Sequence, residues 1–378
     1  AIVIQTKDPN FQEMEGMVSA GIGNVGTASG RAVISAPIVE DKVAIRAGYA
    51  YNSIDGHWRN DFSNELVRKS REHSYMGQVM IRPSELLEID IKASRSEIRG
   101  TGINWNAMIL GANTDNFSGD NVELPWVYNI PGGSRTNRTN ASMKIDYELP
   151  DMFTITSVTA YEKSSDSYTG DSYPYFYDPA QFDVFFPGAA PVGLGAQTQW
   201  LARSSEVKHQ ELRLTSPSED RFRWIVGAYY ADFDTLNTST VGADREGFMN
   251  IRDPLPFGSG NQTLSLLWDD NNNEAYAVYG NFAFDVTDKL ELNASIRYDK
   301  EKKKQEDLAF PGDPDPADPK AIPTWRIEAW RDRSTSFSAW QPKFTVRYSA
   351  TEDLSTYASW GKGFKTGGFN PFGTGALL

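Results

Sequence analysis

Hydrophobic and polar residues alternate along most of the chain. In the stretch LELNASIRYD, residues 290–299, Leu292 and Ile296 fall on one face, whereas Asn293 and Arg297 fall on the other. The same period of two recurs in residues 43–51, 87–94 and 344–349. This period is typical of β-strands with one apolar and one polar face, and helical spacing is scarce. The chain is therefore expected to be all-β.

The connections between these strands are alternately short and long. Short polar turns are expected at 37–42, 82–86, 148–151, 216–221, 285–289 and 349–353. Long connections rich in Gly, Asn, Asp, Pro and aromatic residues are expected at about 55–72, 99–138, 165–203, 235–270 and 303–333. This strict alternation indicates an antiparallel up-and-down transmembrane β-barrel with every long loop at one end. A soluble domain would normally avoid five loops of this length.

The pattern predicts about 13 strands, which alternate in direction. They are expected at 12–25, 30–38, 43–54, 73–82, 87–98, 139–147, 152–164, 204–215, 222–234, 273–285, 289–302, 335–348 and 353–364. An odd number cannot close as a bacterial single-chain barrel, so we expect an open, curved sheet with Tyr357–Phe364 as an unpaired edge. The polar faces carry Arg46, Lys92, Arg223, Arg297 and Arg347, which fits a water-filled or plugged lumen better than a dry core.

Composition narrows the function classes. The chain of 378 residues has a net charge of −13 and no cysteine, which argues against a nucleic-acid partner and excludes disulfides and thiolate metal sites. No stretch approaches 18 consecutive apolar residues, so no membrane-spanning helix is expected. Aromatic residues make up 12% of the chain, which fits strands with aromatic girdles at a membrane interface. Because the chain opens on an apolar strand without an initiator Met, we expect it to be a segment of a longer protein.

Four stretches together resemble the TonB-dependent outer-membrane receptors. AIVIQTKDP, residues 1–9, resembles the end of that family's plug domain as it passes into the barrel. SEVKHQELRLTSPSEDRFRWIVGAYYAD, residues 205–232, resembles a mid-barrel hairpin, and YAVYGNFAFDVTDKLELNASIRYDKEKK, residues 276–303, resembles the next one. YASWGKGFKTGGFNP, residues 357–371, resembles a Gly- and Phe-rich segment late in the barrel. The four stretches follow the family's order over nearly the whole chain.

The resemblance implies a 22-strand barrel filled by an N-terminal plug, in the outer membrane of a Gram-negative bacterium. Residues 1–9 would be a remnant of the plug, and residues 10–378 would be the first part of the barrel. The implied function is import of a scarce, bulky ligand, first of all a ferric siderophore or other iron complex, with haem, cobalamin or an oligosaccharide as alternatives. The implied partners are TonB with its inner-membrane complex, outer-membrane lipids and lipopolysaccharide.

A passive outer-membrane porin, or a structural barrel without energy coupling, is the alternative function. A porin has no plug, so the stretch at residues 1–9 favours the receptor. A soluble β-propeller would show repeats of about 40–50 residues, whereas the hairpins here are uneven in length. No enzyme signature is present, since G-x-S-x-G, H-E-x-x-H and a phosphate-binding loop are all missing. GIGNVG, residues 21–26, lies in a β meander with no following helix and is not a nucleotide site.

Ligand-binding residues are expected in the long external loops, because a site at the barrel mouth needs aromatic platforms and polar anchors. The candidates are His57, Trp58, Arg59, Trp105, Tyr173, Tyr175, Phe176, Tyr177 and Trp200. The aromatic residues of the loop 165–203 equally fit packing of the loop on itself or an outer aromatic girdle.

Three arginines are candidates for facing the lumen, where they would contact the plug or guide anionic ligands. They are Arg46, Arg297 and Arg347. The simpler interpretation is a ladder of ion pairs along the wall, with partners among Glu291, Asp299 and Asp285. Each such pair would contribute little to stability if it is exposed.

Neither a metal site nor a cofactor is expected. The histidines, at positions 57, 73 and 209, are scattered without ligand spacing. WDDNNNE, residues 268–274, offers oxygen ligands for Ca²⁺ but lacks the Gly and the distal Glu of the known calcium loop, so a solvated loop entering a strand is expected. WGKGFKTGGFNP, residues 360–371, is expected to be the top of an upward strand that turns into an external loop.

Overall fold

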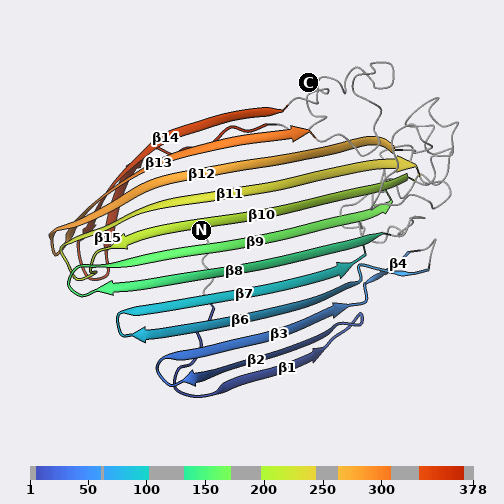
Figure 1. Ribbon diagram of the computed structural model, residues 1–378, viewed down its shortest axis with the longest axis horizontal. Coiled ribbons are helices and arrows are strands. Elements are labelled where there is room, and N and C mark those ends of the chain that lie inside the picture. The colour runs from blue at the N-terminus through green and yellow to red at the C-terminus, as the bar shows by residue number, and fades with distance from the viewer. Residues whose placement is uncertain are drawn as a thin grey trace.

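A single antiparallel sheet dominates the structure, a computed structural model that describes residues 6–60, 64–101, 132–171, 197–243, 263–307 and 332–369. Its strands follow one another in sequence order (Figure 1). They are β1 (Glu15–Ile22), β2 (Ala28–Val39), β3 (Val43–Ile54), β6 (Ser70–Ser84), β7 (Leu87–Gly100), β8 (Gly133–Leu149), β9 (Phe153–Asp171), β10 (Gln197–Thr215), β11 (Phe222–Ala243), β12 (Thr263–Thr287), β13 (Leu290–Asp307), β14 (Arg333–Ser349) and β15 (Ser355–Gly361). A small separate hairpin, β4 (Trp58–Arg59) and β5 (Leu66–Val67), connects β3 to β6.

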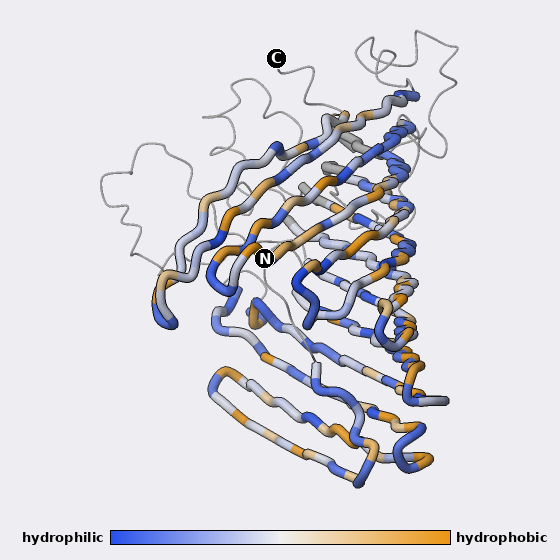
Figure 2. Tube along the Cα trace, turned by 90° about the vertical axis from the view of Figure 1, so that its left-hand side faces the viewer, coloured by the Kyte–Doolittle hydropathy of each residue, from blue (hydrophilic) through white to orange (hydrophobic). Residues whose placement is uncertain are grey.

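The expectation of an open, curved, 13-stranded antiparallel sheet is confirmed. Strands β1 and β15 form its two edges and do not pair with each other in the described part of the chain. Figure 2 shows the curvature of the sheet. Among the described residues there is no helix long and apolar enough to cross a membrane.

The strand ends at the long loops differ from the sequence prediction. Strand β11 runs to Ala243 rather than residue 234, and β12 begins at Thr263 rather than residue 273. Near the loops both faces of the sheet carry polar side chains, as in residues 133–140 of β8, so hydropathy shows no period there. The long loops are accordingly shorter than predicted, because part of each is strand.

The strict alternation of short and long connections is wrong at the first hairpin. Strands β1 and β2 are joined at the long-loop end by a tight turn in which the Gly23 amide donates to the Thr27 carbonyl over 2.9 Å. Val25 and Gly26 have φ values of 52° and 67°, in the left-handed region. A Cβ at Gly26 would lie 2.1 Å from the Asp55 carboxylate, so glycine is required there.

The C-terminal edge strand is shorter than predicted. Strand β15 ends at Gly361, where the expected strand continued to Phe364. Its side chains are exposed along its whole length, as expected for an edge. Trp360 stacks on Phe344 of β14 with ring centroids 6.1 Å apart, and Phe344 is in register with Ala294, near the short-turn end of β13. The closing stretch therefore begins low on the sheet, and the prediction that it forms the top of an upward strand is wrong.

The N-terminal segment (residues 6–14) identifies one face of the sheet as the inner one. Phe11 is buried in a cluster with Ala44 of β3 and Met80 of β6. The amide of Asn10 donates to the Ser35 hydroxyl over 2.8 Å. We call the face that carries Ser35, Ala44 and Met80 the lumen face, and the opposite one the outward face. The pairing register extends this assignment from strand to strand, and alternation along each strand then assigns every other side chain to one of the two faces.

Replacing Phe11 with Ala should release the N-terminal segment from the sheet. The ring is 8% exposed and lies under the Arg82 guanidinium at 4.1 Å from its centroid. Its removal should cost about 2–3 kcal/mol of local stability. Hydrogen–deuterium exchange of the intact receptor should show faster exchange at the Asn10 amide. Met14→Ala is the control because Met14 is 73% exposed, and equal exchange in the two variants would contradict this packing.

Candidate functional site

The outward face is apolar and exposed. Leu212, Val278, Ile296 and Phe344 lie on it, each more than two fifths exposed. Aromatic side chains bound this apolar band at both ends: Phe222, Phe284 and Tyr348 toward the short turns, and Tyr230, Tyr276, Tyr298 and Trp340 toward the loops. Tyr276 and Phe284 are eight positions apart on β12, or roughly 26 Å along the strand. With both aromatic borders included, this length matches what a tilted strand needs to cross the hydrocarbon layer of a membrane.

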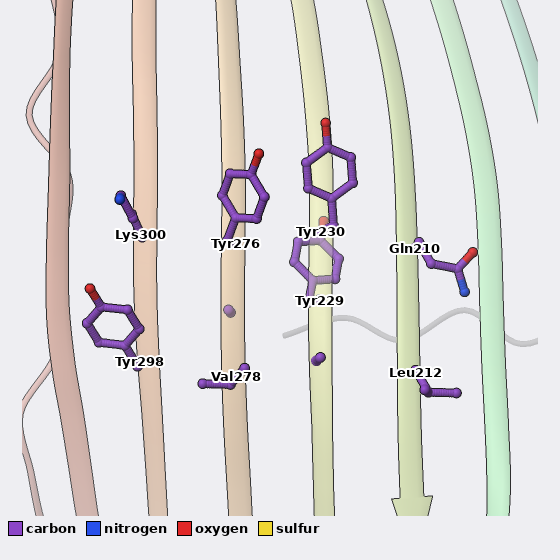
Figure 3. Close-up of a pocket in the computed structure, with 10 residues that line it drawn as sticks. Gln210, Leu212, Tyr229, Tyr230, Tyr276, Val278, Tyr298 and Lys300 are labelled. Atoms are coloured by element: carbon purple, nitrogen blue, oxygen red, sulfur yellow. The ribbon is translucent and has the colours of Figure 1, made fainter.

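The upper aromatic border is amphipathic. In Figure 3, the hydroxyls of Tyr230, Tyr276 and Tyr298 all point toward the long-loop end of the sheet. These rings line an outward hollow of about 450 Å³ together with Leu212 and Val278. Rings in the apolar layer with hydroxyls directed out of it are typical of a membrane interface.

The lumen face is polar at the same height. One cross-strand row, from β6 to β13, carries mainly hydroxyl and amide side chains, and we call it the polar row. Its members are Ser74, Ser96, Ser164, Ser205, Thr235, Asn271 and Gln305, with Arg138 between Ser96 and Ser164. Such a row suits water and a polar ligand, whereas it could not face lipid without unpaired groups.

A lumen hollow of about 660 Å³ lies along this row at the β2–β8 side of the sheet. Arg31 and Arg138 belong to its lining, in register with Ser74 and Ser96, and they are separated by roughly 19 Å of wall. Glu72 accepts a hydrogen bond from the Ser74 hydroxyl over 3.0 Å. Neither arginine forms an ion pair with a residue that the structure describes. The hollow therefore offers two free guanidinium groups to an anion, and its volume is typical of ligand sites.

A denser ionic cluster lies on the lumen face nearer the short turns. The Arg223 guanidinium donates to Asp285 over 2.9 Å and to Glu291 over 2.7 Å. Higher on β13, Arg297 binds Asp299 over 2.8 Å. The Arg223 contacts cross from β11 to β13 and fix the wall, whereas the Arg297–Asp299 pair lies within β13; in both cases the charged groups already have partners and are not free for a ligand.

Tyr279 of β12 lies across Gly227 of β11, its partner in register. A Cβ at Gly227 would lie 2.5 Å from the Tyr279 hydroxyl, so only glycine allows the ring this position. The hydroxyl donates to Glu211 of β10, and the Arg297 guanidinium lies 5.8 Å from the ring centroid. The Tyr279 ring of β12 thus occupies the space above Gly227 of β11 and bonds to β10, so it links three strands on the lumen face.

The three predicted lumen arginines have different surroundings. Arg46 lies on the lumen face, 3.7 Å from Glu15 of β1, and Arg297 is paired with Asp299 as described. Arg347 lies opposite Glu291 in register but forms no ion pair within the described chain, because Glu291 binds Arg223. The predicted ion-pair ladder is therefore correct for Arg297 and wrong in the partners of Glu291 and Asp285. Contact of these arginines with a plug stays a prediction.

His57, Trp58 and Arg59 lie in the small hairpin at the loop end. The rings of His57 and Trp58 are 5.4 Å apart, and the Arg68 guanidinium covers Trp58 at 4.9 Å. Arg59 donates to the Asn64 carbonyl over 2.5 Å. Much of the bonding is therefore within the hairpin, and a role in ligand binding stays a prediction.

Of the other predicted ligand residues, the structure describes Trp200. Trp200 lies within β10 rather than in a loop, in register with Thr169, and it shares the outward face with Leu212. Trp105, Tyr173, Tyr175, Phe176 and Tyr177 lie outside the described residues. The binding role of all these side chains stays a prediction.

The stretch WDDNNNE is not the loop that the sequence predicted. Residues 268–274 lie within β12, so consecutive side chains point to opposite faces and cannot converge on one cation. No group of three His, Asp or Glu side chains suited to a metal occurs in the part of the chain that the structure describes.

Comparison with known proteins identifies the family. The family profile "TonB dependent receptor-like, beta-barrel" matches residues 92–376, about three quarters of the chain. The chain belongs to the TonB-dependent receptor family. Its members are outer-membrane β-barrel proteins of Gram-negative bacteria, so the apolar outward face lies in the outer membrane.

Solved receptors share the fold of this TonB-dependent receptor chain. The ferric yersiniabactin uptake receptor FyuA from Yersinia pestis aligns with a TM-score of 0.68 and 12% identity, over 94% of this chain and 47% of its own. The ferric-catecholate import receptor Fiu from K12 E. coli aligns with a TM-score of 0.64 and 15% identity, over 94% of this chain and 51% of its own. The ferripyoverdine receptor of Pseudomonas aeruginosa aligns with a TM-score of 0.63 and 13% identity, over 93% of this chain and 42% of its own. The chain spans about half the length of these receptors.

Sequence reasoning missed the two arginines of the lumen hollow and the Gly227–Tyr279 pair. Arg138 was assigned to the loop 99–138, whereas β8 begins at Gly133. Arg31 lies at the start of a predicted strand, where counting by two from Ser35 would have placed it on the lumen face. The pairing of Gly227 with Tyr279 depends on the register between strands, which the sequence of one strand does not contain.

Gly227→Ala should destabilise the intact receptor by about 1–3 kcal/mol, because its methyl group would displace the Tyr279 ring and its bond to Glu211. The measurement is the free energy of unfolding in urea in detergent micelles. Gly77→Ala is the matched control, since a Cβ at Gly77 meets no atom within 4 Å. Equal effects of the two substitutions would show that the Tyr279 contact is unimportant.

Proposed function

We propose that this chain is part of an outer-membrane receptor that binds a ferric siderophore, or another iron complex, at its long-loop end and imports it with TonB-coupled energy. The observation that carries this proposal is the lumen hollow, in which two unpaired arginines lie in line with a row of hydroxyl and amide groups. In a chain of net charge −13, free cations on the lumen wall favour an anionic cargo.

The relatives support an iron complex as this cargo. All three of the receptors compared above are named for ferric complexes: yersiniabactin, a catecholate and pyoverdine. The hollow faces the long loops, where the aromatic residues Tyr175 and Tyr177 would supply stacking surfaces. Aromatic platforms with a few cationic anchors suit a bulky, planar chelate.

Energy coupling is favoured over the passive porin by the N-terminal segment. It crosses the lumen face, where Gln78 donates to Asp8 over 3.4 Å and Phe11 is buried. We assign residues 1–9 to the end of a plug domain and the strands to the barrel. The contacts of this segment with the lumen face continue to Phe11, and β1 begins at Glu15. A plug of this kind would receive force from TonB and its inner-membrane complex.

The outward face is proposed to contact outer-membrane lipids and lipopolysaccharide. The apolar band and its aromatic borders match the hydrocarbon layer, and charged side chains begin directly above the tyrosines. There Lys302 of β13 pairs with Glu274 of β12 over 2.9 Å.

Arg31→Gln and Arg138→Gln, each in the intact receptor, should raise the Kd for an anionic ferric siderophore about tenfold, since each removes a charge-assisted contact. Quenching of intrinsic tryptophan fluorescence by catecholate, hydroxamate and carboxylate ferric complexes measures the affinity. Arg135→Gln is the control, because Arg135 lies on the same strand but on the outward face. If all three variants bind alike, the hollow is not the ligand site.

Deletion of TonB should abolish uptake of radioactive iron from the bound complex while leaving binding to cells intact. Iron limitation should raise expression of the receptor. Uptake that continues without TonB would instead support the passive porin. Binding and transport are measured on the same cells, so loss of the receptor from the membrane is distinguished from loss of coupling.

A further inference from the structure

Three arginines lie side by side on the outward face near the loop end of the sheet. Arg71 of β6 is in register with Arg99 of β7, which is in register with Arg135 of β8. Even-numbered residues of β6, such as Gln78 and Met80, contact the N-terminal segment, so Arg71 points to the opposite face. We call Arg71, Arg99 and Arg135 the arginine row.

The arginine row is short of negative charge. Arg99 donates to the Asn137 side chain over 3.0 Å and lies 3.7 Å from Glu97, but Glu97 also binds Arg95 over 2.7 Å. Arg71 and Arg135 form no ion pair with a residue that the structure describes. Like charges directly opposite one another destabilise a sheet, so this arrangement needs an anion from outside.

The height of the row indicates where that anion resides. Tyr49 and Tyr75 lie below it on the same face, with rings 5.2 Å apart, and the Tyr49 hydroxyl lies 2.9 Å from Nδ1 of His73. Further toward the short turns, Ile91 and Met143 face outward in register and are exposed. The order from apolar residues through tyrosines to arginines is the order from acyl chains to headgroups in a membrane.

We propose that the arginine row is a binding site for the phosphate groups of an outer-leaflet lipid, the lipid A part of lipopolysaccharide. The planar guanidinium binds phosphate in a bidentate manner, and three arginines on adjacent strands span roughly 10 Å, which suits phosphates at the two ends of a disaccharide. The site faces away from the lumen, so it holds membrane lipid rather than the imported cargo. This inference deepens the proposed contact with lipopolysaccharide, and it depends on the outer-membrane location rather than on iron import.

The test uses the intact receptor in detergent micelles with a chelator of divalent cations. Native mass spectrometry measures binding of lipid A with both phosphates and of dephosphorylated lipid A. The double variant Arg71→Gln/Arg135→Gln should lose about tenfold in affinity per arginine for phosphorylated lipid A, and dephosphorylated lipid A should bind equally weakly to both proteins. Arg138→Gln, on the lumen face of β8, should bind phosphorylated lipid A like the wild type.

Unchanged affinity in the double variant, or an equal loss in Arg138→Gln, would overturn the proposal. Displacement of lipid A by excess inorganic phosphate would also overturn it, because the site would then be one for free anions. Heat-modifiable migration in gels checks that each barrel is folded, and the two single variants replace the double variant if it is not. Iron uptake by the double variant should equal that of the wild type, so a failure of this proposal is distinguishable from a failure of the proposed function.

Discussion

The structure depends on the need of every backbone amide and carbonyl in a membrane to find a partner within the protein. Lipid offers no hydrogen bonds, so an extended chain can cross it only as part of a continuous sheet. Strands β1 to β15 of the main sheet satisfy this need by pairing each with its neighbour in sequence. Within the described chain, strand partners are missing on the outer sides of β1 and β15 and along residues 333–342 of β14, beyond the end of β15.

Pairing in this manner also fixes where each side chain points. Because successive residues alternate between faces, the outward band of Leu292 and Ile296 requires Asn293 and Ser295 to face the lumen. There they bond to Asn281 of the neighbouring strand. The same rule places Arg135 and Arg138, three residues apart on β8, on opposite faces of the sheet. The two proposed anion sites therefore lie at similar heights of one wall without sharing a side chain.

The sequence was sufficient to predict the fold where the two faces meet different solvents. The strands containing Leu292 and Ile91 were recognised because one face meets lipid and the other meets water, which produces a period of two. Above the membrane both faces meet water, so the upper part of β8, which contains Arg135 and Arg138, was predicted to be a loop. The tight turn at Gly26 was missed for another reason. Glycine is required there because the Asp55 side chain lies close by, and Asp55, just after the end of β3, is distant in sequence.

The candidate sites were less predictable than the fold. Residues in contact across strands, such as Gly227 with Tyr279 or Arg71 with Arg99, become neighbours only through register. Alternation within one strand places a residue on a face, but it does not reveal its height relative to the next strand. The aromatic loop candidates, from Trp105 to Tyr177, depend on loop conformation rather than on strand period.

The central claim is that the two faces of this sheet meet different solvents, and a spin-label scan of β13 tests it most directly. The chain has no cysteine, so single cysteines at positions 292 to 296 can be labelled one at a time in the intact receptor in lipid bilayers. Collision with oxygen should be high at Leu292, Ala294 and Ile296, whereas collision with a water-soluble nickel chelate should be high at Asn293 and Ser295. A smooth change along the strand, without a period of two, would contradict the account.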